Sequence, residues 1–303
     1  MQCVMYHYVR PKSFYPNVNN FLTLNEFRRQ LEYFEKKNGF LNKNELYNFV
    51  YLGKIPKNSN KIILTFDDGL IDHYKFVYKE LKKRKIWGIF YVNSNQYKTN
   101  KLLDVHRIHI LLNKVPNVKL LSELENIIDD HSISKKDFRL FKKNTYLNQN
   151  YDNQIIIKRV LNYLIRPEFK ENIIDELFKK FKININIYDF YLNEKHIIEM
   201  SKNGMIFGSH SSSHKVLSLL NKRSQTNEIL NSDIFLKNVF PQDYKTFCIP
   251  YGTKNTFNQD TLNILKKFKF DFGFAVKSKK ITSYDFKKNM YNLPRFDCNE
   301  FIN

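Results

Sequence analysis

Cysteine and long apolar segments are both scarce in this sequence. The three cysteines, Cys3, Cys248 and Cys298, lack the spacing of a metal-binding motif and do not indicate a disulfide framework. No segment approaches the ~18 consecutive apolar residues of a membrane-spanning helix. Residues 1–4 include neither a basic leader nor an apolar signal segment. We therefore expect a cytoplasmic protein without an integral membrane span.

Acidic residues are also few in comparison with basic ones. The chain has 30 Asp and Glu against 50 Lys and Arg, which gives a formal net charge of +20. Such a charge raises nucleic acid, a membrane surface or an anionic glycan as partners. The basic residues are spread along the whole chain, as on solvated helix faces, and no nucleic-acid-binding signature accompanies them. Hydrophobic residues make up 42% of the chain, enough for a substantial core, so we expect a folded protein.

A short apolar run, residues 62–66, ends in Asp67, Asp68 and Gly69. A continuous apolar run favours a strand buried on both faces, and Asp-Asp-Gly favours a turn directly after it. Polar groups at the carboxyl end of a buried strand lie where α/β folds place their chemistry. Neighbouring residues of an extended chain point in different directions, so the two carboxylates can serve different functions. The alternative is a solvated turn in which an Asp caps the next helix.

A second motif contains two histidines. Residues 208–214 read Gly-Ser-His-Ser-Ser-Ser-His, follow another apolar run and place His210 four residues before His214. At that spacing the two imidazoles would share one face of a helical turn. Two neutral imidazoles and one carboxylate form a set that binds a metal and leaves coordination positions open. The histidine pair alone is a weak indication, but its combination with Thr-Phe-Asp-Asp-Gly is specific.

These stretches resemble the first two motifs of the polysaccharide deacetylases (carbohydrate esterase family four), which include the chitin, peptidoglycan and nodulation-factor deacetylases. A third match is Cys-Ile-Pro-Tyr-Gly at residues 248–252. Residues 5–11 resemble the first strand of many members, and residues 293–297 resemble the last strand of a subgroup found in surface-polysaccharide gene clusters. The resemblance covers roughly residues 1–97 and 195–303, and the middle of the chain resembles only that subgroup.

The order of the expected elements indicates an α/β fold. Strands and helices alternate along both ends of the chain, which is typical of a parallel sheet or barrel. We expect strands at residues 2–9, 61–66, 87–93, 205–208, 246–249, 272–276 and 292–295. We expect helices in these parts at residues 25–34, 72–84, 194–202, 223–237 and 259–269. The resemblance implies that they build a distorted (β/α)7-type barrel, as a single catalytic domain over residues 1–303.

The middle of the chain, residues 98–195, has a different pattern. It holds a series of helical segments at residues 104–113, 122–130, 135–147, 153–165 and 169–181. No glycine turn of the kind that carries chemistry occurs among them, and the barrel pattern resumes on the far side. We therefore expect a helical insertion within the catalytic domain, which acts as a lid or as a contact surface.

The resemblance implies a role for the residues of each motif. Asp68, His210 and His214 would hold a divalent metal ion, with zinc as the expected metal and Ni2+, Co2+ or Mn2+ as alternatives. Asp67 would be the general base that takes a proton from the attacking water. The backbone N–H of Tyr251 would stabilise the oxyanion, because the preceding proline has no N–H.

The sequence departs from the family pattern at two positions. Many members carry an arginine that orients the base where this chain has Cys248, and Arg295 on the terminal strand is our candidate for that cation. No histidine follows residue 250, although members use a late histidine to protonate the leaving amine. The acid would then be His7, His73 or another group, or be dispensable. Our candidate is His7, at the end of the first strand, with a structural histidine there as the alternative. We expect His73 to be exposed or to support another site residue.

Together these features predict a metal-dependent hydrolase that removes an N-acetyl or formyl group from an amino sugar during surface glycan biosynthesis. The expected partner is an amino-sugar or glycan precursor, and not a nucleic acid. Two alternatives stay open. A hydrolase of a non-sugar C–N bond, such as a cyclic amide, would use the same site, and a non-catalytic glycan-binding protein would keep the metal without the acid. The sequence does not indicate an oligomeric state.

Overall fold

The computed structural model describes the chain except for residues 16–17, 19–20, 57, 134–151 and 302–303. Its residues group into two compact units. The sheet unit comprises Met1–Phe14, Asn20–Lys101 and Ile187–Asn303, and the helical unit comprises Tyr15–Asn19 and Leu102–Asn186. The longer segment of the helical unit, Leu102–Asn186, lies within the expected insertion at residues 98–195, whereas Tyr15–Asn19 lies outside it. That both units form one catalytic domain stays a prediction.

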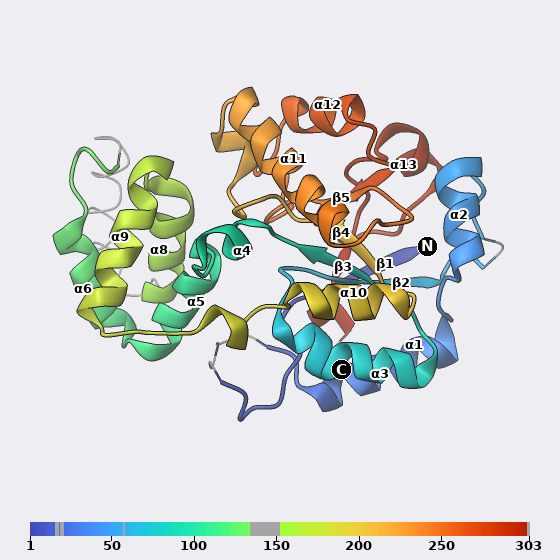
Figure 1. The fold of residues 1–303 in the computed structure, drawn as a ribbon, viewed down its shortest axis with the longest axis horizontal. Helices are drawn as coiled ribbons and strands as arrows, with labels where there is room; N and C mark the ends of the chain where they lie inside the picture. Colours follow the sequence, from blue (N-terminus) through green and yellow to red (C-terminus); the bar gives the residue numbers. More distant parts are fainter. Residues whose placement is uncertain (16–17, 19–20, 57, 134–151, 302–303) are drawn as a thin grey trace. The chain divides into compact units, whose positions relative to one another are not determined.

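Seven parallel strands form the curled sheet of the sheet unit (Figure 1). They are β1 (Gln2–Tyr6), β2 (Ile62–Phe66), β3 (Ile89–Val92), β4 (Ile206–Ser209), β5 (Thr246–Cys248), β6 (Phe272–Phe274) and β7 (Phe296–Asp297). Their order is β6-β5-β4-β3-β2-β1-β7, and all neighbours pair in parallel. Parallel neighbours joined by helical crossovers are the basis of an α/β barrel, so the predicted fold class is confirmed.

The segment before β7 brings the two ends of the sheet together. The N–H of Leu293 donates to the Gly273 carbonyl at 2.8 Å, and the N–H of Ala275 donates to the Leu293 carbonyl at 2.9 Å. This segment therefore pairs with β6, while β7 pairs with β1. We expected the last strand at residues 292–295, but β7 is Phe296–Asp297. The chain makes its pairing with β1 only after it has crossed from β6.

Helices flank the sheet on both sides (Figure 1). Those of the sheet unit are α1 (Leu24–Lys37), α2 (Lys43–Leu52), the π-helical η1 (His73–Tyr78) that continues into α3 (Lys79–Arg84), α4 (Asn95–Thr99), α10 (Glu194–Lys202), α11 (Lys222–Val239), α12 (Gln259–Lys267) and α13 (Ser283–Lys288), with 3₁₀ turns η3 (Ile187–Asp189), η4 (Leu217–Leu219) and η5 (Cys298–Phe301). Every helix expected in these parts is present, but α2, α4 and α13 were not predicted. No helix among the described residues is long and apolar enough to cross a membrane.

The sequence nevertheless carries clear indications of α2. The side chain of Asn42 accepts a hydrogen bond from the N–H of Glu45, and the Glu45 carboxylate accepts one from the N–H of Asn42. This reciprocal pair is a capping box, which marks the start of a helix. Leu46, Phe49 and Val50 are buried at the spacing of one helical face. Because a ten-residue helix has few periodic positions, the capping pair was the stronger indication.

Alternating residues of β2 face opposite sides of the sheet. Ile62 and Leu64 pack into the apolar cluster that includes residues of α1 and α3, whereas Ile63 packs into a cluster with residues of β3 and β6. Because side chains alternate along a strand, Thr65 shares the face of Ile63. Asp67 is the next position on that face. The strand therefore directs this carboxylate toward the interior of the barrel.

The helical unit has an apolar core of its own. Its helices are α5 (Asp104–Lys114), α6 (Asn117–Ile127), α8 (Asn153–Arg159), which continues into the π-helical η2 (Val160–Leu164), and α9 (Pro167–Lys180). The core includes the buried side chains Ile108, Leu111, Leu120, Leu124, Ile157, Leu161, Ile174 and Leu177. Four of the five predicted helices of the insertion correspond to these elements, and α6 begins earlier than expected. The predicted helix at residues 135–147 lies outside the described residues.

Candidate active site

The turn after β2 places two buried carboxylates side by side. The N–H of Asp67 donates to the Tyr6 carbonyl at 2.9 Å, which extends the parallel pairing by one residue. Asp68 and Gly69 then take positive φ angles of 78° and 62°. A Cβ on Gly69 would lie 2.9 Å from Cγ1 of Val92, so this position requires glycine. The tight turn leaves both carboxylates almost fully buried at the end of the strand.

The two histidines lie on an irregular turn, not on a helix. His210 follows β4, and Ser211 and His214 both have positive φ angles, of 61° and 56°. Our expectation that the imidazoles share one face of a helical turn is therefore wrong. In this irregular turn the ring centroids of His210 and His214 still lie 4.9 Å from each other. Its small serines let the backbone bond to the surrounding structure instead of to itself.

Asp68, His210 and His214 converge on one point. Oδ1 of Asp68 lies 3.5 Å from Nε2 of His210 and 3.5 Å from Nε2 of His214. All three side chains are buried, and their ligand atoms lie within 4.8 Å of one another. These separations exceed a normal hydrogen bond. Two ligand atoms bound at about 2.0–2.1 Å to one tetrahedral zinc ion lie roughly 3.3–3.4 Å apart, so the spacing suits a shared ion.

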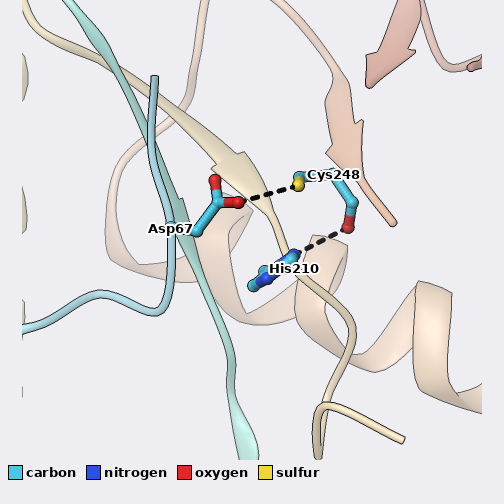
Figure 2. Close-up of side chains that lie close together, drawn as sticks. All are labelled: Asp67, His210 and Cys248. Carbon is cyan, nitrogen blue, oxygen red and sulfur yellow. Dashed lines mark hydrogen bonds between the residues drawn. The ribbon is translucent and has the colours of Figure 1, made fainter. Parts of the chain in front are cut away.

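The tautomer of His210 also suits a metal ligand. Its Nδ1 lies 2.8 Å from the carbonyl oxygen of Cys248, as Figure 2 shows. A carbonyl only accepts hydrogen bonds, so Nδ1 carries the proton and Nε2 directs a lone pair toward Asp68. Burial lowers the pKa of His210, against the opposing effect of the Asp67 and Asp68 carboxylates. The neutral imidazole that a metal requires is therefore favoured.

Arg295 forms a two-point ion pair with Asp67. Its Nη1 donates to Oδ1 at 2.9 Å and its Nη2 to Oδ2 at 2.8 Å, with both side chains buried. Burial would raise the pKa of Asp67, but the positive charge of Arg295 and the hydrogen bonds that it donates outweigh this effect and lower that pKa. The carboxylate is therefore ionised at neutral pH and held in one orientation.

Cys248 lies beside Asp67, to which its thiol is hydrogen-bonded (Figure 2). Its Sγ lies 3.4 Å from Oδ2 of Asp67 and 2.9 Å from Nη2 of Arg295. Asp67, His210 and Cys248 are also close enough to hold an ion. Three observations disfavour that set: Arg295 already engages both oxygens of Asp67, the Cys248 carbonyl engages Nδ1 of His210, and burial raises the pKa of the Cys248 thiol, whose thiolate would be the ligand.

His7 and Tyr251 border the same site. Nε2 of His7 lies 3.9 Å from Oδ2 of Asp67, and its side chain is 39% exposed. The ring of Tyr251 lies 4.7 Å from that of His214, and its backbone has a φ of 59°. His73 is fully buried, and its Nε2 lies 3.0 Å from the His7 carbonyl, so it supports the backbone of a site residue.

Asp297, His106 and His109 are also polar residues that could serve a site, but packing or a turn is the expected role of each. The carboxylate of Asp297 accepts hydrogen bonds from the backbone and side chain of Asn299, so it is a turn residue. His106 and His109 belong to α5 of the helical unit, where His106 is buried.

Sequence reasoning missed the residues that support the histidine turn. Asn93 follows β3 and donates to the carbonyls of His210 and Ser211, and Glu228 on α11 binds the backbone and side chain of Ser213. A buried ion pair between Arg10 and Asp72 was missed as well. Only Asn93 had a signal in the sequence, because it is a polar residue at the carboxyl end of a predicted strand.

The chain is similar to known proteins both in sequence and in fold. Residues 54–169 and 174–273 match the profile of a family described as polysaccharide deacetylase. No significant match to a curated protein was found. Among solved structures the chain resembles the Streptococcus pyogenes deacetylase PplD in complex with acetate (18% identity, 98% of this chain and 91% of that chain, TM-score 0.60), IcaB from Ammonifex degensii (17%, 95% and 94%, 0.54) and a de-N-acetylase from Aggregatibacter actinomycetemcomitans (14%, 98% and 95%, 0.56).

The matched residues contain the chemistry described above. They cover well over half of the chain and include Asp67, Asp68, His210, His214 and Tyr251. At identities of 14–18% the solved structures show the shared fold. The chain therefore belongs to the polysaccharide deacetylase family, whose members are metal-dependent hydrolases of carbon–nitrogen bonds other than peptide bonds.

Proposed function

We propose that this protein removes N-acetyl groups from the amino sugars of a glycan precursor during surface glycan biosynthesis, with a divalent metal ion, expected to be zinc, held by Asp68, His210 and His214. One observation carries the proposal. The three ligand atoms converge beside a second carboxylate, Asp67, which Arg295 keeps ionised and oriented. The names of the similar structures, a deacetylase with bound acetate and a de-N-acetylase, support the choice of an N-acetyl substrate.

A bound divalent cation supplies Lewis-acid polarisation of the acyl oxygen and lowers the pKa of water. Asp67 acts as the general base that accepts a proton from the attacking water. The two hydrogen bonds from Arg295 fix the carboxylate, so that a free lone pair faces the reacting centre. The low pKa of Asp67 makes it a weak base, and its contribution is therefore largely one of position.

Tyr251 stabilises the negative charge that develops on the acyl oxygen. Pro250 has no N–H, so the next backbone donor of this turn belongs to Tyr251. The positive φ of Tyr251 and its contact with His214 place that residue beside the metal ligands. A preorganised N–H that faces developing charge is an effective stabiliser of such a transition state.

His7 protonates the leaving amine. The anion of an amine is a poor leaving group, so the nitrogen must be protonated as the C–N bond breaks. The step therefore needs an acid close to Asp67, the base. Nε2 of His7 lies 3.9 Å from Oδ2 of Asp67, and the partly exposed ring is accessible to substrate. His73 fixes the backbone carbonyl of His7 and thus the origin of its side chain.

The test is an acetate-release assay on N-acetylglucosamine oligosaccharides, with the metal content measured in parallel. We expect Asp67→Asn to lower turnover by about 10²–10⁴-fold, the range typical of a lost general base, while the protein keeps its metal. Asp260→Asn is the matched control, because Asp260 is a partly exposed carboxylate that pairs with Lys222 on the protein surface.

Four outcomes would contradict the proposal. Metal-independent release, or no release from any N-acylated sugar, would exclude a metal-dependent sugar deacetylase. Release from cyclic amides alone would favour the hydrolase of a non-sugar C–N bond. Stoichiometric metal with tight glycan binding and no turnover would favour a binding protein.

A further inference from the structure

The turn that carries both histidine ligands has an unfavourable backbone conformation. Ser211 and His214 have positive φ angles, which a residue with a Cβ adopts at a cost of about 1 kcal/mol or more. Such a conformation persists only where surrounding contacts determine it. Within the turn, the Ser211 hydroxyl accepts a hydrogen bond from the N–H of His214 at 3.0 Å. One local bond does not fix four successive residues, so other parts of the fold must hold the turn.

The residues that follow β3 bind the carbonyl groups of the histidine turn. The side-chain amide of Asn93 donates to the carbonyls of His210 and Ser211, at 2.5 and 3.3 Å. The N–H groups of residues 94 and 95 both donate to the carbonyl of Ser212, at 3.2 and 2.9 Å. Three successive carbonyls of the turn are thus bound by three successive residues that follow β3. The acceptors are carbonyls, so only the NH2 end of Asn93 can face them.

Helix α11 accepts hydrogen bonds from the N–H and hydroxyl groups of the same turn. The N–H of Ser212 donates to the backbone carbonyl of Glu228 at 2.8 Å. The N–H and the hydroxyl of Ser213 donate to the two carboxylate oxygens of Glu228, at 2.8 and 2.5 Å. Glu228 therefore binds three donors of the turn.

We propose that Asn93 and Glu228 are positioning residues that align His210 and His214 for metal binding. This inference rests on the proposed metal site and adds which residues set its affinity. Removing a contact that orients metal ligands typically weakens metal binding about 10–100-fold.

The two residues differ in how replaceable they are. Asn93 is fully buried, so water cannot take over its two hydrogen bonds. Glu228 is half-buried, and water can reach the donors that it leaves. We therefore expect Asn93→Ala to have the larger effect. Asn93→Asp should be at least as harmful, because a carboxylate cannot donate to carbonyls and would repel them.

The experiment measures equilibrium Zn2+ affinity of the metal-free full chain by competition with a chromophoric chelator, and records the visible spectrum after loading with Co2+. Expected is a rise in the dissociation constant of about 10–100-fold for Asn93→Ala, and of about tenfold or less for Glu228→Ala. Glu228→Gln keeps an acceptor for the N–H and a donor for the hydroxyl of Ser213, so it should restore wild-type affinity. Asn231→Ala, an exposed change on the same helix, is the control.

A changed Co2+ spectrum in the Asn93 and Glu228 variants, with the circular dichroism of the fold retained, would support positioning over general instability. Wild-type affinity and spectrum in both Ala variants would overturn the inference while the metal site itself stands. If Asn93→Ala does not fold, the pair Glu228→Ala and Glu228→Gln decides alone. Failure of the wild-type chain to bind Zn2+ or Co2+ stoichiometrically would overturn the metal site and this inference together.

Discussion

Each unit of the molecule contains a buried arginine paired with a carboxylate, and the pairs formed by Arg295 and by Arg107 differ in kind. In the sheet unit, Arg295 and Asp67 are both buried and meet through two parallel hydrogen bonds. In the helical unit, Arg107 contacts Asp175, whose side chain is 45% exposed, and stacks 4.8 Å from the ring centroid of Phe178. Both charges of the Arg295–Asp67 pair are buried, whereas the carboxylate of the Arg107–Asp175 pair is partly exposed to water.

The difference between the two pairs shows where the fold accepts the free-energy cost of burying charges. Burying an ion pair brings little net stability, because the desolvation of both ions offsets their attraction. A pair of this kind at the end of β2, within 3.9 Å of His7, indicates a site selected for chemistry. The core of the helical unit is an apolar cluster, and the carboxylate of Asp175 that pairs with Arg107 is partly exposed. We therefore expect changes in the two units to affect different properties: catalysis and metal binding in the sheet unit, and stability alone in the helical unit.

The largest expected effect follows from breaking the buried pair. Arg295→Met leaves the Asp67 charge buried without its partner, which should cost about 3–5 kcal/mol of unfolding free energy and most of the activity. Chemical denaturation and the acetate-release assay measure the two effects. In the double variant Asp67→Asn/Arg295→Met both charges are gone, so part of the stability should return. A double variant as unstable as Arg295→Met would contradict the pairing argument.

The helical unit should respond to loss of packing instead. Leu177 is fully buried in its apolar core, and Leu177→Ala should cost about 2–5 kcal/mol through lost burial and the cavity left behind. Hydrogen exchange would locate the loss in α5, α6 and α9. Metal affinity should stay at the wild-type value. Weaker metal binding in this variant would break the division between the two units.

One pH-dependent effect is expected in the sheet unit. Burial lowers the pKa of His73 to about 4, from about 6.5 in an unfolded chain. Between these values the unfolded chain binds a proton and the folded protein does not, so stability falls as pH falls. The shift amounts to about 3 kcal/mol by pH 4.

His73→Gln keeps an N–H donor for the His7 carbonyl and removes the titration. It should therefore lose less stability than wild type between pH 7 and pH 4.5 in urea unfolding. His131→Gln, an exposed histidine of the helical unit, should follow wild type. Equal pH dependence of His73→Gln and wild type would contradict the assignment of a buried neutral histidine.

The sequence was most informative where local residues determine the local structure. The strand at residues 62–66 and the Asp-Asp-Gly turn could be predicted because apolar continuity and turn chemistry act over a few residues. The conformation of the histidine turn could not, because contacts from Asn93 and Glu228, distant along the chain, determine it. Spacing alone suggested a helical turn that those contacts overrule.

Arg295 was proposed as the partner of Asp67 from the resemblance to a family, and not from a local sequence pattern. Arg295 lies 228 residues from Asp67 and meets it only because β7 and β2 both neighbour β1. Local propensity has no information about such a contact. The absence of an arginine at Cys248 was the only indication, and the small cysteine there leaves Sγ in contact with the incoming guanidinium. The sequence thus identified the residues of the candidate site more completely than their arrangement.

The smallest expected effect repeats the same substitution in the helical unit. Arg107→Met removes a cation whose partners Asp104 and Asp175 are partly exposed, so both carboxylates can be hydrated after the change. Methionine keeps much of the contact with Phe178, and we expect a loss of about 1 kcal/mol or less in unfolding free energy, with activity retained. Urea denaturation of Arg107→Met beside Arg295→Met makes the comparison direct. A loss as large as that of Arg295→Met would mean that exposure of the partner carboxylate does not govern the cost of removing a buried arginine.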